Sequence, residues 1–155
     1  MHTPLPPTRT VRRAAALLTC VAVLVTAPIP AMAALRDRRQ MLSETNEDRI
    51  VRDLRGVHLN ARMSDLARRH SRAMARQGRL FHTQDPARYY LRGINWSAWG
   101  ENVGYTSDDA RDLQRRFMNS RPHRANILTR RFDHVAIGAV WRNGRLWVTV
   151  FFYDR

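Results

Sequence analysis

The chain has 155 residues, of which 27 are basic and 13 acidic, and its formal net charge at pH 7 is +14. Every basic residue is an arginine, and the composition of 44% hydrophobic and 26% charged residues excludes a disordered or low-complexity chain. The length is that of one domain. The single cysteine excludes an intrachain disulfide and a cysteine-based zinc cage.

The N-terminal segment predicts export from the cytoplasm. Arginines among the first 13 residues precede an uncharged run over residues 14–35, which contains Ala31-Met32-Ala33 near its end. A basic stretch, an apolar run and a small-x-small site form a signal peptide in this order. We predict that residues 1–33 are the signal peptide, and that no transmembrane segment remains after cleavage. The alternative is an uncleaved anchor over residues 14–35, which would also place the following domain outside the cytoplasm.

The rest of the chain is expected to form a short linker, residues 34–42, and one folded domain, residues 43–155. A basic chain suggests anionic partners, because guanidinium pairs well with phosphate and carboxylate. The arginines are dispersed over the sequence without a continuous run. This dispersion disfavours nucleic acid and leaves an anionic cell-envelope polymer, a lipid or a protein as the expected partner.

The first helix is expected over residues 45–56. Thr45 stands three residues before an acid, which is a capping-box spacing, and Ile50 and Val51 begin an apolar face. A second helix is expected from Ser64, a good N-cap residue, to Gly78. It would place His70 on its packed face, where a histidine is more often a hydrogen-bonded core residue than a ligand.

Residues 79–106 mix aromatic residues with Gly, Pro, Asn and Ser, and they are expected to form a loop with short extended pieces. A third helix is expected with Asp108, Asp109 and Asp112 in its first turns, because acids there favour helix formation, and it ends before Pro122. Ser120 is expected to cap a short fourth helix with Pro122 in its first turn.

The C-terminal residues predict a β-hairpin. Two β-rich runs, residues 135–141 and 145–153, flank Arg142-Asn143-Gly144-Arg145, a sequence typical of a type I′ turn. Pairing Arg142 with Arg145 makes both faces of the hairpin apolar, so both faces need cover. The predicted fold class is α+β: an α-β-α sandwich with a central antiparallel sheet.

Four segments in chain order resemble the bacterial branch of the CAP superfamily, also called SCP-like, which is named for cysteine-rich secretory proteins, antigen 5 and pathogenesis-related proteins. The four are Phe81-His82-Thr83, Gly100-Glu101-Asn102-Val103, the run from Phe117 to Leu128 that contains Arg121-Pro122-His123, and Val135-Ala136-Ile137-Gly138. The resemblance covers residues 43–153. It implies the same α-β-α sandwich, the CAP/SCP-like fold, in a secreted protein of the extracellular space or the cell envelope.

The resemblance also implies a cleft lined by histidines and acids. His82 and His123 match the cleft histidines, and Glu101 matches the first acid. Ser120 stands where the eukaryotic branch has a second acid. Asn102, Ser120 and Asn126 are expected to be neighbours of the cleft. Members of the family can bind divalent metal at these histidines, so the resemblance implies Zn²⁺ or another divalent metal at His82 and His123.

The trio of His82, Glu101 and His123 is compatible with three chemistries: a metal site, an acid–base pair, and a polar lining that recognises a ligand without turning it over. The sequence offers no nucleophile for covalent catalysis. The favoured function is therefore a secreted module that binds a ligand or partner. The alternative is a metal-assisted extracellular hydrolase of peptide, glycan or phosphodiester bonds, since a fold does not decide a reaction.

Overall fold

The computed structural model describes residues 29–155. Its helices are α1 (Ile29–Ile50), α2 (Ala61–Gln77), α3 (Pro86–Tyr90), α4 (Ala110–Asn119) and α5 (Arg121–Leu128). Its strands are β1 (His58–Leu59), β2 (Trp99–Thr106), β3 (His134–Arg142) and β4 (Arg145–Tyr153).

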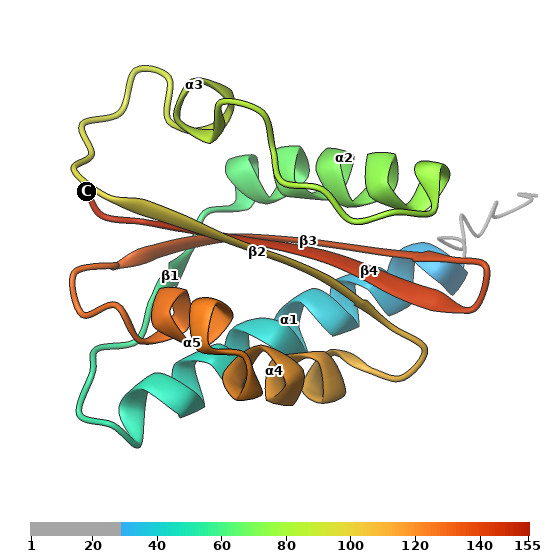
Figure 1. The fold of residues 1–155 in the computed structure, drawn as a ribbon, viewed down its shortest axis with the longest axis horizontal. Helices are drawn as coiled ribbons and strands as arrows, with labels where there is room; N and C mark the ends of the chain where they lie inside the picture. The colour runs from blue at the N-terminus through green and yellow to red at the C-terminus, as the bar shows by residue number, and fades with distance from the viewer. Residues whose placement is uncertain (1–28) are drawn as a thin grey trace, which may run out of the picture.

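The strands form one sheet in the order β1-β3-β4-β2. The two-residue β1 runs parallel to β3, and the other neighbours are antiparallel. Helices α2 and α3 lie on one side of the sheet, and α1, α4 and α5 lie on the other (Figure 1). The fold is the predicted α-β-α sandwich, and the long strands form its antiparallel centre.

The hairpin has the predicted register. Arg142 pairs with Arg145, and the turn residues Asn143 and Gly144 have positive φ angles of 50° and 69°. On one face Ile137 belongs to the core beneath α1, α4 and α5, and on the other Phe151 packs in the core beneath α2. Both residues are 0% exposed, so both faces of the hairpin are covered as predicted.

The first helix differs from its prediction. Helix α1 includes residues 34–42, which were expected to be a linker, and it ends at Ile50. Thr45 therefore lies inside the helix, where its hydroxyl donates to Gln114 Oε1 at 3.3 Å instead of capping. Ile50 and Val51, the expected start of an apolar face, are 61% and 68% exposed.

The buried face of α1 is mostly polar, which explains why hydrophobic periodicity did not reveal it. Four fully buried residues follow one another at four-residue spacing: Asp37, Met41, Thr45 and Arg49. Asp37 accepts a hydrogen bond from Trp141 Nε1 at 2.6 Å, and Arg49 donates to backbone carbonyls of three later segments. Their partners lie far away in the sequence, so local patterns could not identify this face.

The predicted signal peptide lies mostly in residues 1–28, outside the described residues. The predicted cleavage after Ala33 would fall inside α1 and would leave Asp37 and Met41 in the mature chain. Within residues 29–155, no helix has both the length and the apolar composition needed to cross a bilayer.

Helix α2 begins four residues before the predicted start. Its N-cap is Asn60, whose Oδ1 accepts a hydrogen bond from Met63 N at 3.0 Å. Ser64, the expected cap, is buried inside the helix and accepts from Ile137 N of β3 at 3.1 Å. The C-terminal end at Gly78 is as predicted. His70 is a hydrogen-bonded core residue, because its Nε2 donates to Phe81 O at 2.9 Å.

Residues 79–106 contain more regular structure than predicted. They include α3 and the eight-residue strand β2, which pairs with β4 along its whole length. Gly100, Asn102 and Gly104 have low intrinsic strand propensity, so the local sequence did not indicate a strand. Pairing with the apolar β4 decides its conformation.

Helix α4 begins at Ala110, within two residues of its predicted start, and ends before Pro122 as predicted, and α5 begins after Ser120 as predicted. The Asp109 carboxylate caps α4 by accepting from Asp112 N at 2.9 Å, and Pro122 lies in the first turn of α5. Ser120 occupies the N-cap position of α5, but its side chain makes no capping hydrogen bond. The expected role of the Ser120 hydroxyl is therefore wrong, although the helix boundary is right.

Candidate functional site

His82 and Glu101 form the centre of the candidate site. His82 Nδ1 lies 2.9 Å from Glu101 Oε1. Because a carboxylate only accepts hydrogen bonds, Nδ1 carries a proton, and Nε2 has a free lone pair whenever the ring is neutral. The His82 side chain is 63% exposed and that of Glu101 only 1%. A buried acid thus orients an accessible imidazole.

Thr83 completes the surroundings of Glu101. Its backbone N–H donates to Oε1 at 2.9 Å, and its hydroxyl donates to Oε2 at 2.6 Å. The Tyr90 hydroxyl lies 3.5 Å from Thr83 Oγ1, and burial raises the pKa of Tyr90 well above its ordinary value. The sequence interpretation gave Thr83 no role. Its position directly after His82 in the sequence was the feature that could have indicated a role in the site.

Asn102 follows Glu101 in β2, and its side chain faces the opposite side of the sheet, because side chains alternate along a strand. Asn102 is 0% exposed and its Nδ2 donates to the backbone carbonyl of His123 at 3.0 Å. Asn126 Nδ2 in turn donates to Asn102 Oδ1 at 2.8 Å and to Glu101 O at 3.2 Å. These bonds hold α5, and with it His123, against β2.

Gly100 permits this close approach of α5 to β2. A Cβ atom at residue 100 would lie 2.5 Å from Asn126 Oδ1, closer than nonbonded carbon and oxygen atoms can come. The glycine of the Gly-Glu-Asn segment therefore has a packing role beside the histidine–acid pair.

His123 reaches the same region from α5. Its ring is half-buried and packs against Phe117, with ring centroids 4.9 Å apart. Burial lowers the pKa of His123 below its ordinary value of 6.5, and the charge of His82 lowers it further. His82 contacts β2, an edge strand of the sheet, through Glu101, and the backbone of His123 contacts the same strand through Asn102.

By residue type, two imidazoles and a supporting carboxylate are groups that a divalent metal site uses. His82 offers Nε2, and the lowered pKa keeps His123 neutral, as a metal ligand must be. Both Glu101 oxygens already accept hydrogen bonds, so Glu101 stands behind His82 as an orienting group. The half-buried Ser120 brings no carboxylate. Within residues 29–155, no three His, Cys, Asp or Glu side chains are grouped closely enough to hold an ion.

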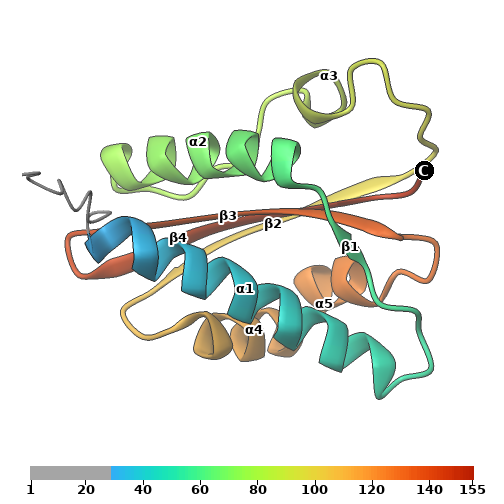
Figure 2. The ribbon, with the colours of Figure 1, turned by 180° about the vertical axis from the view of Figure 1, so that it is seen from behind.

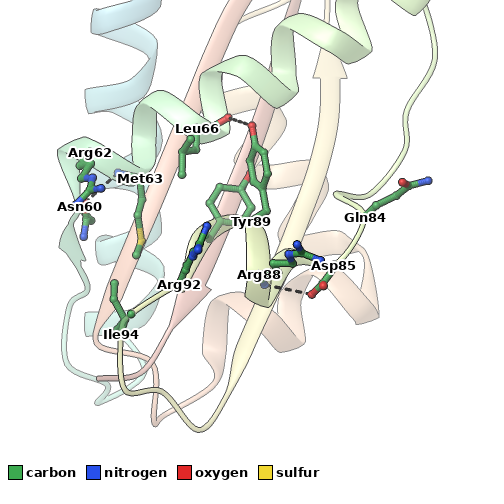
Figure 3. Close-up of a pocket in the computed structure, with 12 residues that line it drawn as sticks. Asn60, Arg62, Met63, Leu66, Gln84, Asp85, Arg88, Tyr89, Arg92 and Ile94 are labelled. Atoms are coloured by element: carbon green, nitrogen blue, oxygen red, sulfur yellow. Dashed lines mark hydrogen bonds between the residues drawn. The ribbon is translucent and has the colours of Figure 1, made fainter.

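A cavity of about 630 Å³ lies beside this site, between the start of α2 and the segment that contains α3 (Figure 3). Arg62, Arg88 and Arg92 line it together with apolar Met63 and Leu66. The predicted residues His82, Glu101 and His123 do not line the cavity. Tyr90 connects the two, because it lines the cavity and also reaches Thr83.

The His123 pKa predicts a dependence of stability on pH. A histidine whose folded pKa is lowered binds fewer protons in the folded state than in the unfolded state. The free energy of unfolding should therefore fall as pH drops through the unfolded value of about 6.5 to the lower folded value. Urea unfolding between pH 7.5 and 5 would measure this. His123→Gln should show a smaller decrease than wild type, and equal decreases would contradict the assignment.

Comparison with known proteins relates the chain to others of this fold. The chain is 27% identical over 119 residues to YkwD of Bacillus subtilis (strain 168), covering 73% of this chain and 46% of YkwD. An extracellular protein containing a SCP domain from Bacillus anthracis str. Ames superposes with a TM-score of 0.70 at 23% identity, covering 84% of this chain and 45% of that protein. The chain thus spans less than half the length of these two relatives.

A second similar structure is an outer surface protein from Borrelia burgdorferi. It superposes with a TM-score of 0.70 at 14% identity, covering 77% of this chain and 93% of that protein. The sequence pattern of the family described as "CAP: Cysteine-rich secretory protein family" matches residues 42–152, which include both site histidines and Glu101. The chain therefore belongs to the CAP family of cysteine-rich secretory proteins.

Proposed function

We propose that the protein is an extracytoplasmic CAP domain that binds a ligand at the outer edge of β2, through His82 and His123. The observation that carries this proposal is the state of Glu101. Its side chain is 1% exposed, and both its oxygens accept hydrogen bonds from Thr83 or His82. A general base needs a lone pair that can reach the substrate. Glu101 instead holds His82 in position, so the exposed imidazole is the group that meets a ligand.

The ligand class follows from the charges around the site. Arg62, Arg88 and Arg92 line the adjacent cavity, and Asp85 is the acid among its lining residues. Guanidinium groups recognise phosphates and carboxylates. The bound group is therefore anionic, as in a cell-envelope polymer, an acidic lipid or an acidic protein. The predicted signal peptide and the extracellular and outer-surface relatives support a location outside the cytoplasm.

A divalent ion such as Zn²⁺ would be held by Nε2 of His82 and a ring nitrogen of His123, with Glu101 hydrogen-bonded behind His82. Bound there, the ion would supply a positive centre for an anionic group of the ligand. The side chains themselves orient the site: Glu101 directs His82, and Asn102 anchors the backbone of His123.

Calorimetric titration of Zn²⁺ into the purified protein tests the metal part of this proposal. We expect binding at pH 7.5 and much weaker binding at pH 5.5, because a protonated imidazole cannot coordinate metal. The double variant His82→Ala with His123→Ala should lose binding without loss of thermal stability. His58→Ala, which changes an exposed histidine on the short strand β1, is the matched control and should bind as wild type.

Two results would contradict the proposal. Equal Zn²⁺ binding by wild type and the double variant would place the metal elsewhere. Turnover of peptide, glycan or phosphodiester substrates that is lost in Glu101→Gln would show that the His82–Glu101 pair supports catalysis and would favour the metal-assisted hydrolase.

A further inference from the structure

A second candidate site lies at the opposite edge of the sheet from the histidines. Strand β1 pairs only with His134 and Val135 of β3, so among the described residues the outer side of β3 from Ile137 to Arg142 has no neighbouring strand. A groove of about 720 Å³ follows this edge. Its walls are α2 and the N-terminal part of α1, and Figure 2 shows β3 between these two helices.

The backbone of β3 presents unused hydrogen-bonding groups to this groove. Arg142 and Arg145 flank a two-residue turn and form a hydrogen-bonded pair. Every second residue of β3, counted back from Arg142, therefore directs its N–H and C=O groups to β4. The residues between them, Ile137, Ala139 and Trp141, direct their N–H and C=O groups outward. Ser64 Oγ accepts from Ile137 N. No described residue pairs with the backbone groups of Ala139 and Trp141.

The α2 wall of the groove is cationic. Arg68, Arg72 and Arg76 lie at four-residue spacing and line the groove together, and Arg142 lies at the end of β3. The acid in this wall is Asp65, 3.7 Å from Arg68. Three arginines at helical spacing thus line the groove beside the open strand edge, with one carboxylate, that of Asp65, at the Arg68 end of the row.

The α1 wall differs in character. It consists of Ala34, the 42% exposed Leu35 and Arg38. Arg38 Nε is buried, and no described residue accepts a hydrogen bond from it. The groove therefore has a cationic wall, a mostly apolar wall and an open strand edge between them.

We propose that the outer edge of β3 binds an extended acidic segment of a partner protein as an additional strand. An added strand satisfies the outward N–H and C=O groups of Ala139 and Trp141, as β-augmentation does in other proteins. Its side chains alternate between the two walls. Acidic side chains at every second position pair with Arg68, Arg72 and Arg76, and the intervening apolar side chains contact Ala34 and Leu35.

Charge favours an acidic partner segment over two other possible occupants of the groove, the N-terminal residues of this chain and a second copy of it. Residues 1–28 of the chain contain three arginines and no acid, so they lack the carboxylates that would pair with the α2 wall. A second copy of the chain that paired its own β3 edge here would bring Arg68, Arg72 and Arg76 against the same three residues. Like charges juxtaposed in an interface disfavour association. An acidic partner segment has neither disadvantage.

The test uses a fluorescent peptide of alternating glutamate and valine, about six residues long because a strand rises about 3.3 Å per residue along the open edge. We expect fluorescence anisotropy to detect binding by the purified protein. A peptide with three valines followed by three glutamates has the same composition and should bind at least about tenfold more weakly, because it cannot present acids to one wall only.

N-methylation of the peptide tests strand pairing directly. In a strand, the N–H groups of all glutamates point to one side and those of all valines to the other. Methylating one of these two sets should weaken binding by about tenfold or more, and methylating the other should change it by less than about threefold. The sensitive set reveals whether the added strand is parallel or antiparallel. Equal effects of the two modifications would overturn the proposal in favour of a purely electrostatic site for anionic polymers.

Variants of α2 test the cationic wall. Arg72→Glu should weaken peptide binding by about tenfold or more, because it removes one attraction and adds a repulsion. Arg69→Glu makes the same charge change at an exposed neighbour that does not line the groove, and it should have less than about a threefold effect. Equal effects would show that the peptide responds to the overall charge and would overturn the proposed location.

Hydrogen exchange reports whether the edge is open before the peptide arrives. The amides of Ala139 and Trp141 should exchange faster in the free protein than those of Val140 and Arg142, which bond to β4, and peptide should protect them. Full protection of Ala139 and Trp141 in the free protein would mean that another segment or a second copy already covers the edge, and would overturn the proposal. Absence of peptide binding would overturn it as well.

Discussion

Gly138→Ala should destabilise the domain by at least about 3 kcal/mol and lower its Tm by roughly 10 °C or more. A Cβ atom on residue 138 would overlap the backbone carbonyl group of Ala67 and the amide nitrogen of Arg68, both in α2. Backbone atoms inside a helix cannot move away individually, so the whole of α2 would have to rise from the sheet. That movement would also break the hydrogen bond from Ser71 Oγ to Gly138 O.

Gly104→Ala is the matched control. Its added Cβ would also be crowded, at 2.8 Å from Phe117 Cε1 and 2.9 Å from Leu113 Cδ1, but these atoms belong to side chains that can shift. We expect a loss of about 1 kcal/mol, in the usual range for modest overpacking. Urea unfolding monitored by tryptophan fluorescence would compare the two variants. Equal losses would contradict the close packing of α2 on β3.

Arg49→Met should cost about 4 kcal/mol or more of stability. Arg49 is 0% exposed, and its guanidinium donates hydrogen bonds of 2.8–2.9 Å to four backbone carbonyls: those of Arg55, Ile127, Thr129 and Phe132. Burial lowers the pKa of this guanidinium. The side chain joins the end of α1 to the end of α5 and to the loop before β3. Its removal would leave buried carbonyls without donors.

Two further variants make this prediction specific. Arg49→Lys keeps the charge but replaces the planar fork by a single ammonium group, so it should lose most of the stability that Arg49→Met loses. Arg52→Met removes an arginine one turn later, whose exposed guanidinium pairs with Asp48 at 3.2 Å, and should cost less than about 1 kcal/mol. Denaturant unfolding measures all three. A small loss for Arg49→Met would show that water reaches these carbonyls.

The parts of the fold that the sequence predicted correctly are those determined by neighbouring residues. The Asn143-Gly144 turn adopts positive φ angles readily, so it sets the hairpin register from four adjacent residues. The C-terminal end of α2 follows likewise from Gly78, which takes a left-handed conformation, and the start of α5 follows from Pro122 in its first turn. In each case the physical cause is a backbone preference of the residue itself.

The candidate site was predicted through motifs, and only in part. His82 and Glu101 were named from the family resemblance, and they are hydrogen-bonded. Thr83 was not assigned a role, and Asn102 and Asn126 were expected only as neighbours, because their donors and acceptors meet through the pairing of β2 with β4 and the docking of α5. Hydrogen bonds between segments 18 to 25 residues apart have no local signature.

The sequence by itself determined the hairpin and the helices that follow residue 108, and the candidate site residues were named through the family resemblance. Tertiary structure alone decided where α1 begins and ends, that β2 is a strand, and that Arg49 is buried. The buried face of α1 is polar, so its stability comes from distant carbonyls and side chains, and β2 is extended because β4 offers it a partner. Long-range pairing overrides local propensity wherever the local sequence has no strong preference of its own.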